Sequence, residues 1–210
     1  LAVQLRSEAQ RDPSGSALAR RYRDFARHAR PGNPPRFVID TSPANLRRIG
    51  FLSLLHPRVP IIFCRRDPLD LAVALYFKHF KTGHGYSYSL SAIGRAIARS
   101  EQLMAHWLRE LPNPMATVHY EALARDPTGT IQAIGRALGI AIRVADPGIT
   151  DGSAAAESES EWRLFTARSI DAHGSIRPDL IGFGERFSPH MQTAINAYKE
   201  ESAHASRISL

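Results

Sequence analysis

Residues 61–78 read IIFCRRDPLDLAVALYFK, and this stretch decides the fold. The short apolar run Ile61–Cys64 is bounded by polar residues, a pattern that predicts a buried β-strand. Asp67 and Pro68 follow as the N-cap and the first residue of a helix that we expect to end near Phe80. A buried strand that leads directly into a helix is typical of a parallel sheet in an α/β fold.

Strands and helices also alternate along the rest of the chain. Apolar runs predict two more short strands, at residues 37–39 and 116–119. Apolar residues at helical spacing predict helices at residues 17–29, 44–55, 90–110, 121–126, 128–138, 162–169 and 189–201. This alternation favours a parallel sheet covered by helices on both faces. Within it, a polar linker at 141–160 separates a core at 17–140 from a helical tail at 161–210.

The composition fits one globular domain. Of the 210 residues, 43% are hydrophobic and 22% are charged, which excludes a disordered or fibrous chain. Cys64 is the single cysteine, so an internal disulfide is impossible and a reducing compartment, the cytoplasm, is expected. The sequence predicts neither a membrane span nor a signal peptide. Because the chain starts at Leu1 rather than at methionine, we expect its N-terminus to be incomplete.

Arginine dominates the charge of the protein. The formal net charge is +7, which implies an anionic partner, and an arginine-rich genome is the alternative explanation. Arg65 and Arg66 follow a predicted parallel strand and precede a helix, where free backbone amides and forked guanidinium donors favour a phosphate. The alternative is a structural ion pair with Asp67 or Asp70. A basic nucleic-acid-binding module is a weaker interpretation, because the arginines are not interleaved with aromatic residues.

The nine histidines do not predict a metal site. They are spread over separate elements, without a His-x-x-x-His pair or a nearby group of carboxylates. His106 and Trp107 are expected to pack on the long helix. Cys64 lies in a predicted buried strand and no Gly-x-Ser-x-Gly turn is present, which argues against a hydrolase.

A series of motifs runs from Asp40 to Ile140. They are Asp40-x-x-Pro43-x-Asn45, CRRDPLDLAVALYF, HGYSYSL, LMAHW, VHYEAL, ARDP and RALGI. In this order they resemble the bacterial sulfotransferases that are often joined to tetratricopeptide repeats and are related to tyrosylprotein and cytosolic sulfotransferases. The resemblance implies a P-loop-like three-layer α/β/α fold, and it implies transfer of a sulfuryl group from 3′-phosphoadenosine 5′-phosphosulfate to a hydroxyl or amine acceptor. It also implies an upstream tetratricopeptide-repeat region as a partner.

The resemblance assigns donor-binding roles to four positions. Arg66 stands where the family grips the 3′-phosphate of the donor, and Ala74 stands where it carries a serine for the same phosphate. Lys78 matches a second basic residue of tyrosylprotein sulfotransferases, and a solvated helix residue is the alternative. Tyr120 matches the tyrosine that contacts the adenine, and a half-buried core residue is the alternative.

The tail and the Asp-x-x-Pro motif carry further matches. Arg177 before Pro178 resembles a basic-proline segment, and Arg186 before Phe187 resembles a basic-tryptophan pair that closes over the nucleotide. Thr41 occupies the position of a lysine that stabilises charge developing near the sulfuryl group. A hydroxyl cannot supply that charge.

The family places a strand and a glycine-rich phosphate loop before the Asp-x-x-Pro motif, and this sequence contains neither. We therefore expect residues 1–210 to be a partial sulfotransferase domain, either a truncated fragment or a degenerate copy. It should bind no metal, and it has no assigned catalytic residue, general base or acceptor pocket. Alone, it should transfer sulfuryl groups far below an enzyme-like rate. The alternative from another class is a noncatalytic protein that keeps the nucleotide pocket for binding or as a scaffold.

Overall fold

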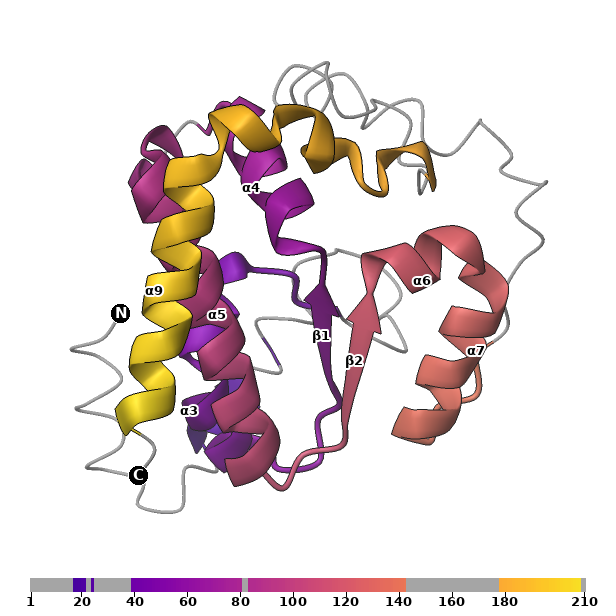
Figure 1. The fold of residues 1–210 in the computed structure, drawn as a ribbon. Coiled ribbons are helices and arrows are strands. Elements are labelled where there is room, and N and C mark those ends of the chain that lie inside the picture. The colour runs from indigo at the N-terminus through magenta and orange to yellow at the C-terminus, as the bar shows by residue number, and fades with distance from the viewer. Residues whose placement is uncertain (1–16, 22–23, 25–38, 81–82, 143–177, 209–210) are drawn as a thin grey trace. The chain divides into compact units, whose positions relative to one another are not determined.

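The computed structural model describes residues 17–21, 24, 39–80, 83–142 and 178–208 (Figure 1). The chain divides into two compact units. The first comprises residues 1–60 and 105–114, and the second comprises residues 61–104 and 115–210. The second unit contains both described strands and the pair of arginines that follows the first of them.

The described residues form two short strands and a larger number of helices. In chain order the elements are η1 (Pro43–Arg47), α3 (Ile49–Leu55), β1 (Ile61–Arg65), α4 (Pro68–Phe77), η2 (Gly85–Tyr88), α5 (Leu90–Glu110), β2 (Met115–His119), α6 (Tyr120–Arg125), α7 (Pro127–Leu138), η3 (Pro178–Leu180), η4 (Phe183–His190) and α9 (Gln192–Ile208), where η denotes a 3-10 helix. The helices predicted at 90–110, 121–126 and 128–138 are confirmed. Most of the 37–39 strand, most of the 141–160 linker and the 162–169 helix lie outside the described residues.

β1 and β2 form a parallel pair, which confirms the α/β fold class. Phe63 lies opposite Thr117 in the register, and Arg65 lies opposite His119. Each strand leads directly into a helix, β1 into α4 and β2 into α6 (Figure 1). The residues that follow the two strands therefore meet at the same edge of the sheet, where open α/β folds bind ligands.

β1 is buried on one face only, which corrects the prediction of a buried strand that includes Cys64. Phe63 is buried, whereas Ile62 is 47% exposed and Cys64 is exposed. Successive side chains of a strand point to opposite faces, and the described residues cover only the Phe63 face of β1. On β2 the buried residues are Ala116 and Val118, which point to the face of the sheet opposite Phe63. Helix α7 packs against β2.

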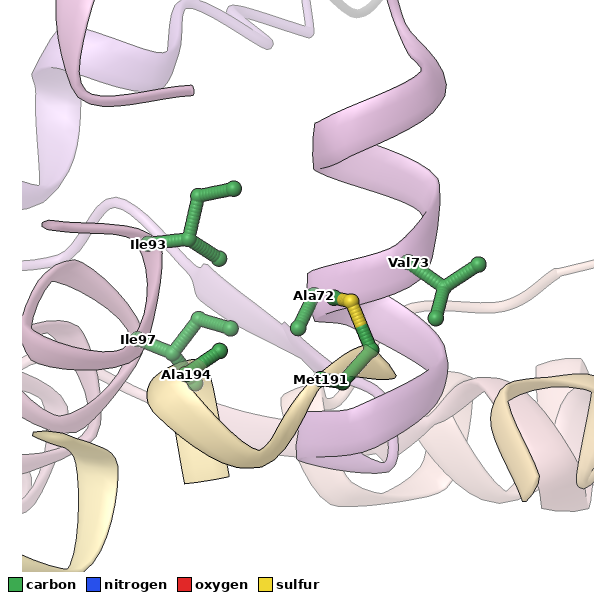
Figure 2. Close-up of a cluster of buried hydrophobic side chains, with 6 residues drawn as sticks. All are labelled: Ala72, Val73, Ile93, Ile97, Met191 and Ala194. Atoms are coloured by element: carbon green, nitrogen blue, oxygen red, sulfur yellow. The ribbon is translucent and has the colours of Figure 1, made fainter. Parts of the chain in front are cut away.

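The main hydrophobic core of the second unit lies between α4, α5 and the junction of η4 with α9. Its buried members are Ala72, Val73, Ile93, Ile97, Met191 and Ala194 (Figure 2). α4 starts as predicted, with Asp67 as N-cap and Pro68 as its first residue. It ends at Phe77, earlier than predicted, because Lys78 has an extended backbone. The core therefore fixes α4, and with it the end of β1.

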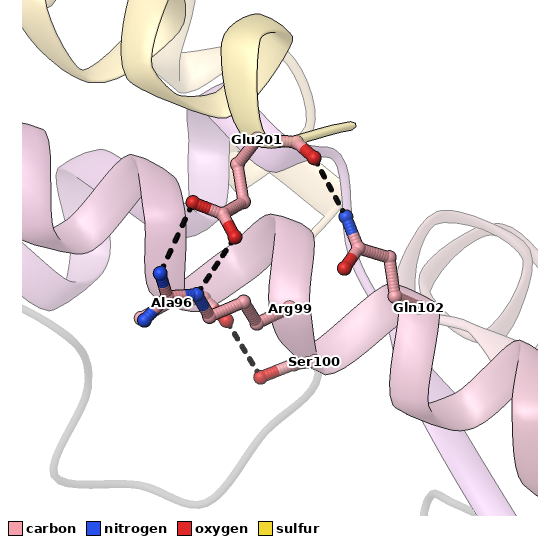
Figure 3. A network of polar contacts seen from close by, with 5 residues as sticks. All are labelled: Ala96, Arg99, Ser100, Gln102 and Glu201. Carbon is pink, nitrogen blue, oxygen red and sulfur yellow. Dashed lines mark hydrogen bonds and ion pairs between the residues drawn. The ribbon is translucent and has the colours of Figure 1, made fainter. Parts of the chain in front are cut away.

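α5 and α9 pack closely against each other. Gly94 permits this contact, since a Cβ atom there would collide with the carbonyl of Ala194. The Arg99 guanidinium donates to both carboxylate oxygens of Glu201 at 2.8 and 3.2 Å, and the Gln102 amide donates to the Glu201 carbonyl at 2.9 Å (Figure 3). The hydrogen bonds and charge of Arg99 lower the pKa of Glu201. These contacts hold the C-terminal helix on α5.

The helix predicted at 44–55 is split into η1 and α3. Pro43 opens η1, and the amide of Arg48 then donates to the carbonyl of Asn45, a 3-10 type of bond. Arg48 has φ −112° and ψ −6°, outside the usual α-helical values, so the helix axis is interrupted there. The apolar spacing identified the helical region, but it did not show this interruption.

Trp107 packs within the first unit, as expected. Its indole Nε1 donates to the carbonyl of Leu46 at 2.8 Å, and its ring lies directly against Gly50. His106 is exposed, and its ring contacts the Trp107 ring at 4.7 Å between centres. The LMAHW motif is therefore a packing motif at its tryptophan.

Candidate functional site

Arg66 lies at the carboxyl end of the sheet, as predicted, directly after β1. Its Nη2 donates to the carbonyl of Leu180 at 3.1 Å, and its guanidinium carbon lies 4.6 Å from the centre of the Tyr120 ring. Nε is buried, and no described residue accepts a hydrogen bond from it. A carbonyl and an aromatic ring thus hold the guanidinium, which keeps donors for an anion.

Arg65 has a different environment. Its Nη2 pairs with Oε1 of Glu101 at 2.8 Å, and Oε2 of Glu101 accepts from the Tyr198 hydroxyl at 2.6 Å. Desolvation, together with the hydrogen bond and charge of Glu101, raises the pKa of Tyr198 to about 12. Because a carboxylate already neutralises Arg65, the neighbouring arginine is the better candidate for an external anion.

The N-terminus of α4 is closed, which corrects the expectation of free backbone amides there. Asp67 Oδ1 accepts from the amides of Leu69 and Asp70 at 2.9 and 3.0 Å. The amide of Asp67 itself donates to Glu121 Oε1 at 2.7 Å. A capping carboxylate uses the same donors that a phosphate would need. An anion at this edge of the sheet therefore depends on side-chain donors.

The alternative of an ion pair between Arg66 and a neighbouring aspartate is not realised in the described part of the chain. Asp67 caps α4 instead. Asp70 is only 2% exposed and accepts from the amides of Gly182 and Gly184 at 2.8 and 2.6 Å. Both aspartates are thus bonded to backbone amides.

Glu121 joins the two strand ends. It lies in the first turn of α6, after β2, and accepts from the amide of Asp67, which follows β1. Desolvation acts to raise the pKa of Glu121, but backbone hydrogen bonds and the charges of His119 and Arg66 lower it overall. The carboxylate is therefore ionised at neutral pH, and it fixes one strand end to the other.

Residues 178–190 run over the carboxyl ends of the strands (Figure 1). This segment supplies the Leu180 carbonyl described above. Arg186 is exposed, and its guanidinium carbon lies 5.5 Å from the centre of the Phe183 ring. Arg177 lies outside the described residues. The C-terminal segment thus contacts the predicted site through the backbone carbonyl of Leu180.

The other predicted residues are spread more widely. Ala74 is half-buried about two turns into α4. Lys78 is the C-cap of that helix, and its Nζ lies 5.1 Å from the centre of the Phe80 ring. Thr41 is exposed and belongs to the first unit. Of the predicted residues, the structure brings the strand-end arginine into contact with the tyrosine after β2.

Sequence reasoning misses the roles that three groups have in this site. Asp70 carries a signal, because it is an aspartate within the otherwise apolar run LDLAVAL. Glu121 has a weaker one, since it follows a strand and starts a helix. The Leu180 carbonyl has none, because every residue carries a backbone carbonyl and the contact spans 114 positions of sequence.

In the described ranges, no group of three or more His, Cys, Asp or Glu side chains is placed to hold a metal ion. None of the described helices combines the length and apolar character needed to cross a membrane.

Fold and site together define an α/β protein with an arginine directly after the first strand of a parallel pair. The profile described as "Sulfotransferase family" matches residues 5–144, and the chain belongs to this family. An uncharacterized protein of Aquifex aeolicus (strain VF5) is 27% identical over 100 residues, which cover 46% of this chain and 13% of that protein. The chain thus corresponds to a small part of this relative. No solved structure matches the chain significantly.

Proposed function

We propose that this domain binds 3′-phosphoadenosine 5′-phosphosulfate and passes its sulfuryl group to a hydroxyl or amine acceptor. Family membership supports a sulfotransferase, an enzyme class that needs a sulfuryl donor. The observation that carries the donor assignment is the Arg66 guanidinium, which lies at the end of β1 with a buried Nε that lacks a described partner.

In this proposal Arg66 holds the 3′-phosphate through its Nε edge. Nε and the adjacent Nη form a planar fork that matches two phosphate oxygens. A buried N–H without an acceptor costs free energy, and a phosphate oxygen removes this cost by accepting from it. A nucleotide with a 3′-phosphate should therefore bind more tightly than one without it.

The remaining donor contacts are proposed around this arginine. Tyr120 supports the guanidinium with its ring and contacts the adenine with its edge or hydroxyl. Arg186, on the segment that runs over the strand ends, adds positive charge on the nucleotide side, and Arg177 precedes the same segment. Lys78 at the end of α4 compensates for the hydroxyl that Ala74 lacks.

The proposed reaction exchanges one bond to sulfur for another. The bond between sulfur and the bridging oxygen of the donor breaks, and a bond forms between sulfur and the acceptor oxygen or nitrogen. The acceptor proton passes to a base or to water, and adenosine 3′,5′-bisphosphate leaves. Because this product keeps both phosphates, it is a suitable ligand for testing the site without turnover.

The setting of the reaction is proposed from sequence. One cysteine among 210 residues supports a reducing compartment, and we place the reaction in the cytoplasm. The resemblance to sulfotransferases joined to tetratricopeptide repeats supports an upstream repeat region as a partner that presents the acceptor.

A noncatalytic nucleotide-binding protein is the second candidate, and two substitutions favour it. Thr41 replaces a lysine expected near the transferred group, and Ala74 replaces a hydroxyl expected on the phosphate. Losing a preorganised charge commonly costs several kcal/mol of transition-state stabilisation. In this second function the site binds the nucleotide without turning it over.

Two measurements on the full chain test these proposals. Calorimetry should show tighter binding of adenosine 3′,5′-bisphosphate than of adenosine 5′-monophosphate, and equal affinities would overturn the donor assignment. Transfer of labelled sulfate from the donor to a panel of phenols, sugars and amines then separates the two candidates. Tighter binding of the bisphosphate without sulfate transfer favours the noncatalytic binding protein. Tighter binding together with sulfate transfer favours the enzyme.

A further inference from the structure

A buried carboxylate ties the C-terminal segment to α4. Asp70 is 2% exposed, and its two oxygens accept from the amides of Gly182 and Gly184 at 2.8 and 2.6 Å. The donors lie 112 and 114 positions further along the chain. Two backbone amides that converge on one carboxylate form a more specific contact than a single hydrogen bond between neutral groups. This contact is therefore a specific attachment point for the tail.

The shape of the tail fits this attachment. Gly182 has φ +73°, a conformation that side chains other than glycine rarely adopt. A Cβ atom on Gly184 would lie 2.8 Å from the amide nitrogen of Asp70 and from the carbonyl carbon of Leu69. The backbone at Gly184 thus lies directly on the first turn of α4. A larger residue at Gly184 would separate the two segments, whereas one at Gly182 would strain the backbone.

The attached segment also holds the strand-end arginine. Leu180, two residues before Gly182, accepts from Nη2 of Arg66 at 3.1 Å. Asp70 follows Arg66 by four residues, so one short stretch of the chain contacts the segment twice. The position of the Leu180 carbonyl depends on where residues 182–184 are fixed.

We propose that Asp70 is a positioning residue for nucleotide binding. By fixing residues 182–184 on α4, it holds the Leu180 carbonyl where that group orients the Arg66 guanidinium, and so it sets the affinity for a 3′-phosphate. The effect on affinity rests on the proposed function, whereas the attachment of the segment can be tested without any nucleotide.

The attachment is tested by trypsin cleavage after Arg186, which is exposed within the segment. Asp70→Asn replaces one accepting oxygen with a donor that faces an amide, and it should speed this cleavage by about fivefold or more. Cleavage after Arg136, which is exposed on α7, serves as the internal reference. The matched control is Asp126→Asn, because Asp126 also accepts a hydrogen bond from a backbone amide at a helix start. Since Asp126 caps α7, this variant should speed cleavage after Arg136 and leave cleavage after Arg186 unchanged. Equal acceleration at both arginines, or none, would overturn the attachment.

A second variant guards against a folding defect in Asp70→Asn. Gly184→Ala keeps the carboxylate but forces the segment away from α4. It should reproduce the faster cleavage after Arg186 while the thermal unfolding of the rest of the chain remains cooperative. An unchanged rate of cleavage after Arg186 in this variant would contradict the proposed contact of residues 182–184 with α4.

The positioning role is tested by a double-mutant cycle with Arg66→Ala. Asp70→Asn should weaken binding of adenosine 3′,5′-bisphosphate by about threefold to tenfold, with little change for adenosine 5′-monophosphate. In the Arg66→Ala background the same change should have almost no further effect, because Asp70 acts through that guanidinium. Equal losses in both backgrounds would show a general structural role and overturn the proposal. If the parent does not discriminate between the nucleotides, the proposed function fails, and the cleavage comparison still decides the attachment.

Discussion

Arg65 and Arg66 are neighbours in sequence, yet the structure gives them opposite surroundings. Arg65 pairs with Glu101, which in turn accepts from Tyr198 on α9. Arg66 contacts a carbonyl and the Tyr120 ring, and its Nε has no partner among the described residues. Two adjacent arginines at a strand end therefore need not act together. Arg65 is paired with a carboxylate, whereas Arg66 is the arginine that we propose binds the nucleotide.

The two surroundings also differ in how charge is balanced. Arg65 and Glu101 form a direct ion pair at 2.8 Å, so this side carries little net field. On the other side, Glu121 is close enough to affect Arg66 electrostatically, but it hydrogen-bonds the Asp67 amide. The Arg66 charge is therefore balanced only at a distance, and this favours recruitment of an anion.

The largest expected effect separates the two arginines. Arg66→Ala should weaken binding of adenosine 3′,5′-bisphosphate by about 2 to 3 kcal/mol, or roughly 30- to 150-fold, because a forked, partly buried charge is lost. Arg65→Ala removes the same formal charge one residue away and should change affinity by less than about threefold. Calorimetry at one ionic strength measures both. Similar losses of affinity in the two variants would mean that the local positive charge alone determines binding. They would contradict the separate roles of Arg65 and Arg66.

The sequence predicted the features that depend on local residue types and on the direction of the strands. Asp67 and Pro68 mark a helix start by their chemistry, and a residue after a parallel strand must lie at the ligand-binding edge. The hydrogen bond from the Asp67 amide to Glu121 was not predictable, since it depends on how two strands pair. The contact of Asp70 with Gly182 was equally hidden, because it joins positions 112 residues apart.

The second prediction concerns Arg65 and its partners, Glu101 and Tyr198. Tyr198→Phe removes the hydroxyl that donates to Glu101, and it should lower the free energy of unfolding by about 1 to 2 kcal/mol without changing nucleotide affinity. The raised pKa means that this stabilisation is present below pH 10 and is lost as the pH rises toward 12. Urea unfolding at neutral pH measures the difference. A loss of nucleotide affinity in this variant would show that the two sides are coupled.

The third prediction concerns the ring that supports Arg66. Tyr120→Leu keeps an apolar side chain but removes the π-face, and it should weaken bisphosphate binding by about 1 kcal/mol, or roughly fivefold. The variant should also bind inorganic phosphate more weakly, but by a smaller factor. This is because the ring orients the guanidinium in addition to facing the adenine. Thermal unfolding of the same variant is the control. A large fall in stability with unchanged relative affinities would identify Tyr120 as a core residue instead.

A smaller effect is expected from restoring a hydroxyl on α4. Ala74→Ser should tighten bisphosphate binding by about threefold, since a hydrogen bond to the charged phosphate is partly offset by the loss of the hydroxyl's hydrogen bonds to water. The matched control is Ala133→Ser, an exposed alanine on α7 that pays a similar propensity cost far from the arginine. If Ala74→Ser binds no better than the parent, the hydroxyl does not reach the phosphate, and Lys78 becomes the residue to test.

The smallest expected effect comes from Glu121, which joins the two strand ends. The pKa of its carboxyl is lowered in the folded protein, so its contribution to stability is present above the ordinary value of 4.5 and is lost as the pH falls through the folded value. Glu121→Gln cannot titrate, although its carbonyl can still accept from the Asp67 amide. The parent should therefore be slightly more stable than the variant at pH 7, and the gap should shrink on acidification. Urea unfolding of both proteins between about pH 7 and pH 3 measures the gap. A gap that stays constant or widens toward low pH would mean that the Asp67 contact does not depend on the charge of Glu121.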